Sequence, residues 1–287
     1  TEADLKSTGV LSGNGVEGDP WMIGSEEALA WFFYQANADA AFQDDYVTLT
    51  ANMNLFGEAY SQKTGTAIDD ALQWTPIRLF KGVFDGGGHT INNLSRSAGQ
   101  SAGTLFDAVS GGIVKNFVLG TGRRIIEGDI GHPTGGLINS LENGSILSNV
   151  TNRGFNVSMT GGMTQGGYMP ATIFVGTLDN STIEDCLNYG SFSGIAWWTI
   201  AACFAGNANS TSTIRRCGNL GRVANTMYVG GIVSNGSGVT IEDCFNGGFV
   251  VGNRNTRAIL RGSGTVNNCY NFGNLGNSYS NFSDGTK

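Results

Sequence analysis

The chain has 287 residues, a formal net charge of −7 and 14% charged residues, against about 25% in an average soluble protein. Glycine accounts for 45 residues and proline for 4, which indicates a folded, turn-rich chain and excludes collagen and proline-rich linkers. Because the sequence has no basic cluster and no apolar run of about 18 residues, we expect no nucleic-acid partner and no membrane insertion.

The first clear predicted element is a helix at residues 25–38, SEEALAWFFYQANA. Ser25 is a suitable N-cap, and the two glutamates that follow it favour the positive end of the helix dipole. Residues 1–18 are then an N-terminal extension. The helix is expected to cover the open end of a β structure with its apolar residues Leu29, Trp31, Phe32 and Phe33.

Downstream of the helix, one sequence unit recurs: TIEDCLNYG at 182–190, TIRRCGNLG at 213–221, TIEDCFNGG at 240–248 and TVNNCYNFG at 265–273. Intervals between units range from 25 residues (241 to 266) to 37 residues (146 to 183). The residues aligned in this way are Ile113, Ile146, Ile183, Ile214, Ile241 and Val266.

Such a period is typical of a solenoid, and short apolar stretches separated by Gly and Asn turns indicate strands rather than helices. The predicted fold class is all-β, a right-handed parallel β-helix with three strands in each coil and an N-terminal capping helix. It is predicted to span residues 19–276 as a single domain. Residues 277–287 are expected to form a tail that leads into further chain.

Four cysteines occupy one equivalent position in successive units, and so do four asparagines. Stacked coils would hold the cysteine Cβ atoms about 4.8 Å apart, whereas a disulfide needs about 3.8 Å, and a line of sulfurs cannot form a zinc tetrahedron. A buried row of free thiols is favoured over a disulfide or a metal site. The predicted structural ladders are Cys186, Cys217, Cys244 and Cys269, and Asn188, Asn219, Asn246 and Asn271.

Charged residues alternate in sign between the units. Stacking in register would place each arginine between carboxylates of two neighbouring coils. The second charged position is expected to be a corner, occupied by Asn149, Asp185, Arg216, Asp243 and Asn268 in turn. The glycines after the asparagines are expected to adopt a positive φ; they are Gly190, Gly221, Gly248 and Gly273.

Several stretches resemble bacterial surface proteins that carry GLUG-type repeats on a pectin-lyase-like parallel β-helix. They include DPWMIGSEEALAWF, YVTLTANMNL, FKGVFDGGGHTINNL and GGIVSNGSGVTIEDCFNGG, and the resemblance runs from about Asp19 to about Gly276. It implies a secreted or cell-surface location. It also implies a role like that of an adhesin or of the N-terminal region of an immunoglobulin-A-specific metallopeptidase.

The sequence contains no His-Glu-x-x-His and no P-loop. We therefore expect a non-enzymatic adhesive or structural module of a larger bacterial protein, with no catalytic residues, metal or cofactor, and a glycan or host surface protein as partner. The alternative is a carbohydrate-active enzyme, a polysaccharide lyase or glycoside hydrolase, or an accessory domain of a surface protease. Its acid would come from Asp69, Asp70 or Asp85.

The predicted ligand contacts are Tyr168, Trp197 and Trp198. Adjacent tryptophans on a strand face opposite sides, so one of them is expected to be exposed. Tyr168 belongs to an insertion at 158–169, one coil earlier. Exposed aromatic rings suit stacking on sugars or anchoring of a protein partner. The alternative is that these residues only cover the bulge that the insertion creates.

Overall fold

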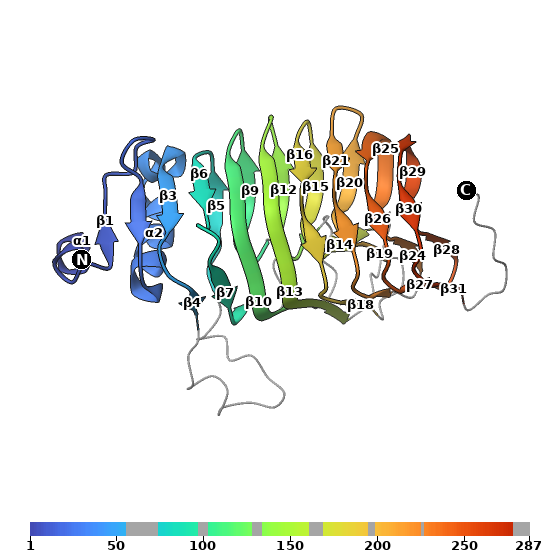
Figure 1. Ribbon diagram of the computed structural model, residues 1–287, viewed down its shortest axis with the longest axis horizontal. Helices are drawn as coiled ribbons and strands as arrows, with labels where there is room; N and C mark the ends of the chain where they lie inside the picture. The colour runs from blue at the N-terminus through green and yellow to red at the C-terminus, as the bar shows by residue number, and fades with distance from the viewer. Residues whose placement is uncertain are drawn as a thin grey trace, which may run out of the picture.

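The computed structural model describes residues 1–55, 74–96, 103–127, 134–160, 169–194, 199–224 and 227–277. The strands of successive coils pair in parallel along the long axis of the molecule, with the N-terminal helices at one end (Figure 1). The predicted parallel β-helix is therefore confirmed. At the N-terminal end, β1 pairs antiparallel with β2.

The strands belong to one large and one small sheet. The large sheet contains β1 (Leu11–Ser12), β2 (Trp21–Ile23), β3 (Tyr46–Leu49), β4 (Met53–Asn54), β5 (Ile77–Phe80), β6 (Val83–Asp85), β7 (Thr90–Asn92), β8 (Leu94–Arg96), β9 (Phe106–Ser110), β10 (Ile113–Glu127), β12 (Ile138–Glu142), β13 (Ile146–Thr160), β15 (Val175–Asp179), β16 (Thr182–Glu184), β17 (Leu187–Asn188), β18 (Phe192–Gly194), β20 (Ala205–Asn209), β21 (Thr213–Arg215), β22 (Gly218–Asn219), β23 (Val223–Ala224), β25 (Val233–Glu242), β26 (Phe245–Asn246), β27 (Val250–Gly252), β29 (Leu260–Asn267), β30 (Tyr270–Asn271) and β31 (Leu275–Asn277). The small sheet contains β11 (Thr134–Gly135), β14 (Met169–Thr172), β19 (Thr199–Ala202), β24 (Tyr228–Gly230) and β28 (Asn255–Arg257).

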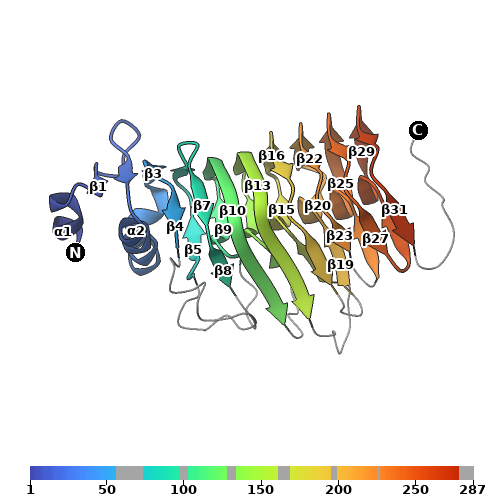
Figure 2. The same cartoon turned by 60° about the horizontal axis from the view of Figure 1, so that its bottom comes forward.

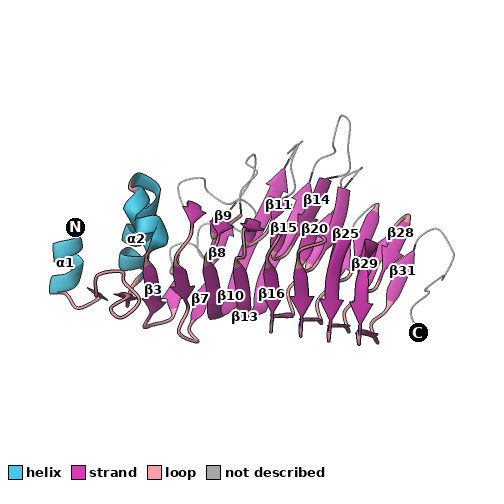
Figure 3. Ribbon diagram, turned by 90° about the horizontal axis from the view of Figure 1, so that it is seen from above, coloured by secondary structure: helices cyan, strands magenta, loops and turns pink. Residues whose placement is uncertain are grey.

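The predicted capping helix is confirmed as α2 (Glu26–Ala38), which lies at the N-terminal end of the solenoid (Figure 3). The Ser25 side chain accepts a hydrogen bond from the backbone N–H of Ala28, as expected of an N-cap. Phe32 packs against Phe80, with ring centroids 6.4 Å apart. The buried face of α2 thus closes the end of the core and covers an apolar surface that would otherwise face water.

Other N-terminal elements extend this end of the molecule. They are α1 (Glu2–Ser7) and a 3₁₀ helix, η1 (Ala40–Asp44). Trp31 packs against the core, as expected, and meets Trp21 edge-on with ring centroids 5.3 Å apart. Leu29 is fully buried, as expected.

Some coils are divided more finely than the three predicted strands. The coil that begins at Phe106 contains three strands, β9 to β11, whereas the coil that begins at Ala205 contains five short strands, β20 to β24. Arg216, with φ of 52°, and the bend at Gly221 interrupt the pairing within the second of these coils. A residue in the left-handed region turns the chain, so the corners of this coil appear as breaks between strands.

The register corrects the sequence alignment by one residue in the two earliest units. Ile183 pairs with Leu147, and not with Ile146, and Leu147 pairs in turn with Val114. Val114 and Leu147 are fully buried, whereas Ile113 is only half-buried. Because side chains alternate between the two faces of a strand, a shift of one residue exchanges inward for outward positions.

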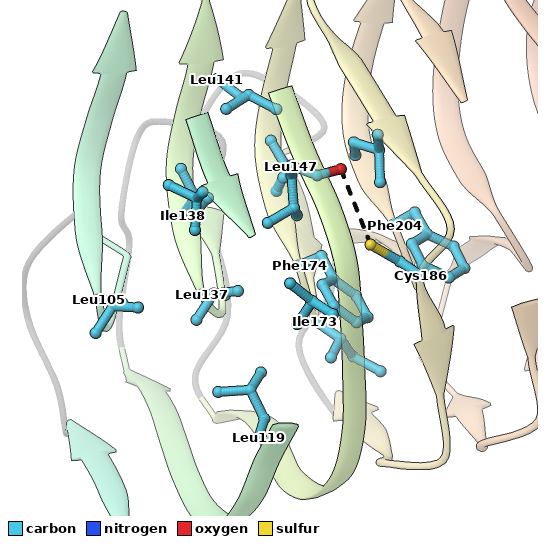
Figure 4. Close-up of a cluster of buried hydrophobic side chains, with 14 of the residues drawn as sticks. Leu105, Leu119, Leu137, Ile138, Leu141, Leu147, Ile173, Phe174, Cys186 and Phe204 are labelled. Carbon is cyan, nitrogen blue, oxygen red and sulfur yellow. Dashed lines mark hydrogen bonds between the residues drawn. The ribbon is translucent and has the colours of Figure 1, made fainter. Parts of the chain in front are cut away.

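The core is a continuous column of apolar side chains inside the coils. Figure 4 shows part of this column, where residues from successive coils point toward one another. Phe174 and Phe204 stack face to face, with ring centroids 4.9 Å apart. Like residues at equivalent positions therefore form rows along the axis, as stacking in register requires.

The corner predicted at the second charged position is confirmed, but the predicted glycine conformation is wrong. Residues at the corner have φ between 47° and 60° in six coils: Asn116, Asn149, Asp185, Arg216, Asp243 and Asn268. None of the four glycines that follow the ladder asparagines has a positive φ. Glycine is needed there for space, since a Cβ on Gly221 would lie 1.8 Å from the carbonyl oxygen of Gly190.

Candidate functional site

The asparagine ladder is present in the structure and runs one coil further than the sequence predicts. Each side-chain amide donates to the side-chain oxygen of the next coil, at 2.7 or 2.8 Å, in the order Asn152, Asn188, Asn219, Asn246 and Asn271. The upstream neighbour of Asn152 is Leu119, so the ladder begins at Asn152. Buried amides that satisfy one another in this way fix the register of the coils.

The cysteines form a row of free thiols in the core. The Sγ of Cys186 lies 3.1 Å from the carbonyl oxygen of Glu184 and 3.9 Å from that of Leu147 on the preceding coil (Figure 4). Cys217 repeats this arrangement with carbonyl oxygens of Arg215 and Ile183. These thiols act as small apolar side chains that also donate weakly to carbonyl groups beside the corner.

We expect the thiols of the folded protein to react slowly with iodoacetamide at pH 8. Burial raises the pKa of Cys203 and Cys217 well above the ordinary value, so the reactive thiolate is scarce. Cys269 is only partly buried and should react before the other four. Mass spectrometry of peptides alkylated with and without denaturant checks this order. A disulfide between adjacent coils, or equal reaction of all five, would contradict the thiol row.

The alternating charges form ion pairs on one side of the arginines. Arg215 contacts Glu184 at 2.7 Å, and Arg216 contacts Asp185 at 2.7 Å, in both cases on the preceding coil. Hydrogen bonds from Arg216 lower the pKa of Asp185. Although Arg215 pairs in register with Glu242, no ion pair joins these two residues within the described part of the chain. The prediction of arginines held between two carboxylates is therefore wrong on one side.

A second group of charges lies inside the solenoid. Arg124 is fully buried, in register with Arg96 on the coil before, and burial lowers its pKa to about 9. Its Nη1 donates to the carbonyl oxygen of Ile125 at 2.7 Å. Burial also raises the pKa of Asp107, while Asn139 and Arg96 partly offset this effect. On the following coils Arg124 is in register with Val157 and then Phe192, so the row that begins with these two arginines continues with apolar side chains.

Of the three acids considered for an enzyme, the structure describes Asp85. Asp85 contacts Lys115 at 3.4 Å and accepts hydrogen bonds from Asn116 and from the backbone of Gly87, so it is held within a corner. Asp69 and Asp70 lie outside the described residues. Among the residues that the structure describes, no three His, Cys, Asp or Glu side chains are grouped to hold a metal ion.

The predicted ligand contacts Tyr168, Trp197 and Trp198 lie outside the described residues. Most of the insertion at 158–169 does as well. The ligand contacts at these three residues remain a prediction, and the candidate site consists of other residues.

A surface that we call the outer strip lies on both sides of the asparagine ladder. It consists of the outward-facing positions immediately before and after the ladder position in each coil, on β7, β10 and β13 and then on β17, β22, β26 and β30 (Figure 2). The positions before the ladder are Thr90, Val118, Thr151, Leu187, Gly218, Phe245 and Tyr270. The positions after it are Asn92, Gly120, Arg153, Tyr189, Leu220, Gly247 and Phe272.

The N-terminal part of the outer strip is hollowed into an open groove of about 460 Å³. Its lining consists of Thr90, Asn92, Val118, Gly120, Thr121, Arg153 and Gly154. Gly120 forms part of the floor, because a Cβ at this position would lie 1.9 Å from Oδ1 of Asn92. The exposed Arg153 contributes a cation to a lining that combines hydroxyl and amide groups with Val118 and glycine backbone, so the groove offers both polar and apolar contacts.

The C-terminal part of the outer strip is apolar. Tyr189 is 51% exposed and Leu220 38%, and Phe272 on the last described coil is 69% exposed. Phe245 and Phe272 stack with ring centroids 5.6 Å apart. These rings lie over glycines of the preceding coil, Gly218 and Gly247, where any Cβ would collide with them. Exposed rings beside glycines offer apolar surface to a ligand.

The sequence analysis missed the outer strip, although the repeat contains its signal. The residues on either side of the ladder asparagine read Leu and Tyr in LNY, Gly and Leu in GNL, Phe and Gly in FNG, and Tyr and Phe in YNF. Once the asparagine faces inward, period-two alternation places both neighbours outward.

Comparisons with known proteins agree with this architecture. A crystal structure of a candidate immunoglobulin A1 protease from Bacteroides ovatus superposes with a TM-score of 0.71 at 18% identity, covering 96% of this chain and 82% of that one. The two chains share a fold. Halomucin from Haloquadratum walsbyi is 29% identical over 167 residues, which is 58% of this chain and 2% of halomucin. No family model matches the chain. No helix among the described residues has the length and apolar character needed to cross a membrane.

Proposed function

We propose that the chain is a non-enzymatic binding module of a secreted or cell-surface protein, and that it attaches to a glycan through the outer strip. The carrying observation is the continuity of an open groove, which carries polar side chains and Arg153, with exposed aromatic rings along one face. Sugar rings present hydroxyl groups at their edges and apolar C–H faces, so they suit a surface that offers both kinds of contact.

The comparisons support a surface module without specifying its ligand. The resemblance to GLUG-type surface proteins and the similarity to halomucin both favour a segment of a large secreted or surface-attached protein. The shared solenoid fold is compatible with many functions, so the proposed role depends on the outer strip.

Catalysis at this site is less well supported than binding. Hydrolysis of a glycosidic bond uses two carboxyl groups, about 5–9 Å apart, on either side of the bond. The outer strip contains no Asp or Glu in any coil from Thr90 to Phe272. The sugar-cleaving alternative would therefore need acids from another face of the molecule.

A screen against arrays of glycans and host surface proteins tests the proposal. We expect Tyr189→Ala to weaken binding of the captured glycan by about 1–3 kcal/mol, because it removes an aromatic platform from the centre of the strip. Tyr34→Ala is the matched control, since Tyr34 is 70% exposed on α2, away from the strip.

The proposal requires that the two variants differ. Unchanged affinity in Tyr189→Ala, or an equal loss in Tyr34→Ala, would show that the outer strip is not the binding site. Capture of a host protein alone, with no glycan bound, would replace the glycan with a protein partner.

A further inference from the structure

The outer strip has a charge opposite to that of the whole chain. The formal net charge of the chain is −7, yet the strip contains Arg153 and no carboxylate. A second row of residues, which lies beyond the glycines that follow the ladder position, also contains no carboxylate. It includes the exposed cations Arg123 and Arg222. The members of this row, which we call the flanking row, are Arg123, Asn156, Ser191, Arg222, Phe249 and Asn274.

The arginines of this surface are not neutralised by neighbouring carboxylates. No ion pair joins Arg153 or Arg222 to an acidic side chain within the described residues. The guanidinium of Arg222 lies 5.9 Å from the ring centroid of Phe249. By contrast, the arginines at the nearby corner, Arg215 and Arg216, bind carboxylates of the preceding coil. The local field of the strip therefore favours an anionic ligand.

The arrangement of these groups follows the solenoid axis. Arg153, Tyr189 and Leu220 occupy the position after the ladder in three successive coils. Neighbouring coils are separated by about 4.8 Å, so a cation, an aromatic ring and an apolar side chain succeed one another at short, regular steps. An extended ligand lying along the axis would meet all three.

We propose that the ligand of the outer strip is an acidic polysaccharide that lies along the solenoid axis. This inference rests on the proposed function and specifies its ligand class. Carboxylate or sulfate groups contact Arg153 in the groove and Arg222 in the flanking row. Apolar faces of the sugar rings stack on Tyr189 and on the rings nearer the C-terminal end, while hydroxyl groups meet Thr90 and Asn92.

The shape of the site favours a polysaccharide over an acidic protein. The residues that dominate protein interfaces insert into well-packed, desolvated pockets. The groove at Gly120 is instead open and combines polar side chains with Val118 and glycine backbone, and the aromatic rings beyond it lie against glycines. A flat chain of sugar rings fits such a surface without an anchoring pocket.

The test compares acidic polysaccharides with neutral forms of the same backbone. The probes are hyaluronan, chondroitin sulfate and alginate, each beside its carboxyl-reduced and, where relevant, desulfated counterpart, with polyglutamate as an acidic polypeptide. We expect at least one acidic polysaccharide to bind at least tenfold more tightly than its neutral form, with an affinity that falls as salt is raised. The double variant R153Q/R222Q should lose about tenfold in affinity.

Arg78→Gln is the matched control, because Arg78 is an exposed arginine on β5, outside the strip and the flanking row. It should bind as the wild type does, and unchanged thermal unfolding of the double variant would exclude misfolding. Equal binding of acidic and neutral forms, still lost in Tyr189→Ala, would overturn the acidic ligand and leave the proposed function intact. Binding of polyglutamate alone would overturn it in favour of an acidic protein. Binding of no probe and of no arrayed glycan would overturn both proposals.

Discussion

Replacing Asn219 by alanine is expected to lower the free energy of unfolding by about 2–4 kcal/mol. The Asn219 side chain is fully buried and makes four hydrogen bonds. It donates to Oδ1 of Asn246 at 2.7 Å and accepts from Nδ2 of Asn188 at 2.8 Å, and both of its other bonds are to the backbone of Gly221. Alanine would leave polar groups on three coils without partners in a site that water does not reach.

Urea-induced unfolding, followed by circular dichroism, measures this loss. Asn271→Ala is the matched control, because Asn271 is the last described rung, only half-buried, and bonded to one neighbouring asparagine. Its effect should be about half as large. Asn219→Leu separates packing from hydrogen bonding, since it nearly restores the volume and none of the polar contacts. Full stability in the leucine variant would show that the ladder contributes only by filling space.

Replacing Gly221 by alanine should be equally damaging for a different reason. The added Cβ would lie 1.8 Å from the carbonyl oxygen of Gly190, on the preceding coil, and 2.7 Å from Nδ2 of Asn188. A backbone oxygen cannot rotate away as a side chain can, so the two coils must separate. We expect a loss of at least about 2–3 kcal/mol, at the upper end of the range for overpacked sites.

A matched glycine distinguishes this clash from a general intolerance of alanine. Gly18 has no atom within 4 Å of an added Cβ and no positive φ, so Gly18→Ala should change stability by less than about 0.5 kcal/mol. Thermal unfolding monitored by tryptophan fluorescence compares the two variants. If Gly221→Ala unfolds at the same temperature as Gly18→Ala, the close approach between coils does not limit the structure.

The repeat unit was sufficient to predict the solenoid, because a buried position must be filled in every coil. Cys217 and Asn219 recur for this reason, and their regular spacing fixed the later coils in register. The two earliest units carry Phe117 and Val150 in place of the cysteine, so Ile113 and Ile146 were aligned one position too early. A β-branched residue fits the inward and outward faces of a strand almost equally well, and only pairing between coils distinguishes them.

The role of the glycines was not predictable from residue type alone. A glycine after an asparagine commonly signals a positive φ, but at Gly190 and Gly221 the requirement is contact with the next coil. The same limit applies to the outer strip. Tyr189 and Phe272 have no distinguishing feature as isolated aromatic residues in the sequence, and their grouping with Arg153 depends on which face each coil presents.

The pairing of each coil with its immediate neighbours also determines how the protein unfolds. Contacts such as Ile183 with Ile214 join residues one coil apart, and the stability of such an array is approximately a sum of coil and interface contributions. Opening at one end therefore costs only a single interface. At the N-terminal end, α2 covers the core and raises that cost. Destabilising α2 should consequently speed amide hydrogen exchange most in the coils next to this helix, and progressively less in the coils further along the axis.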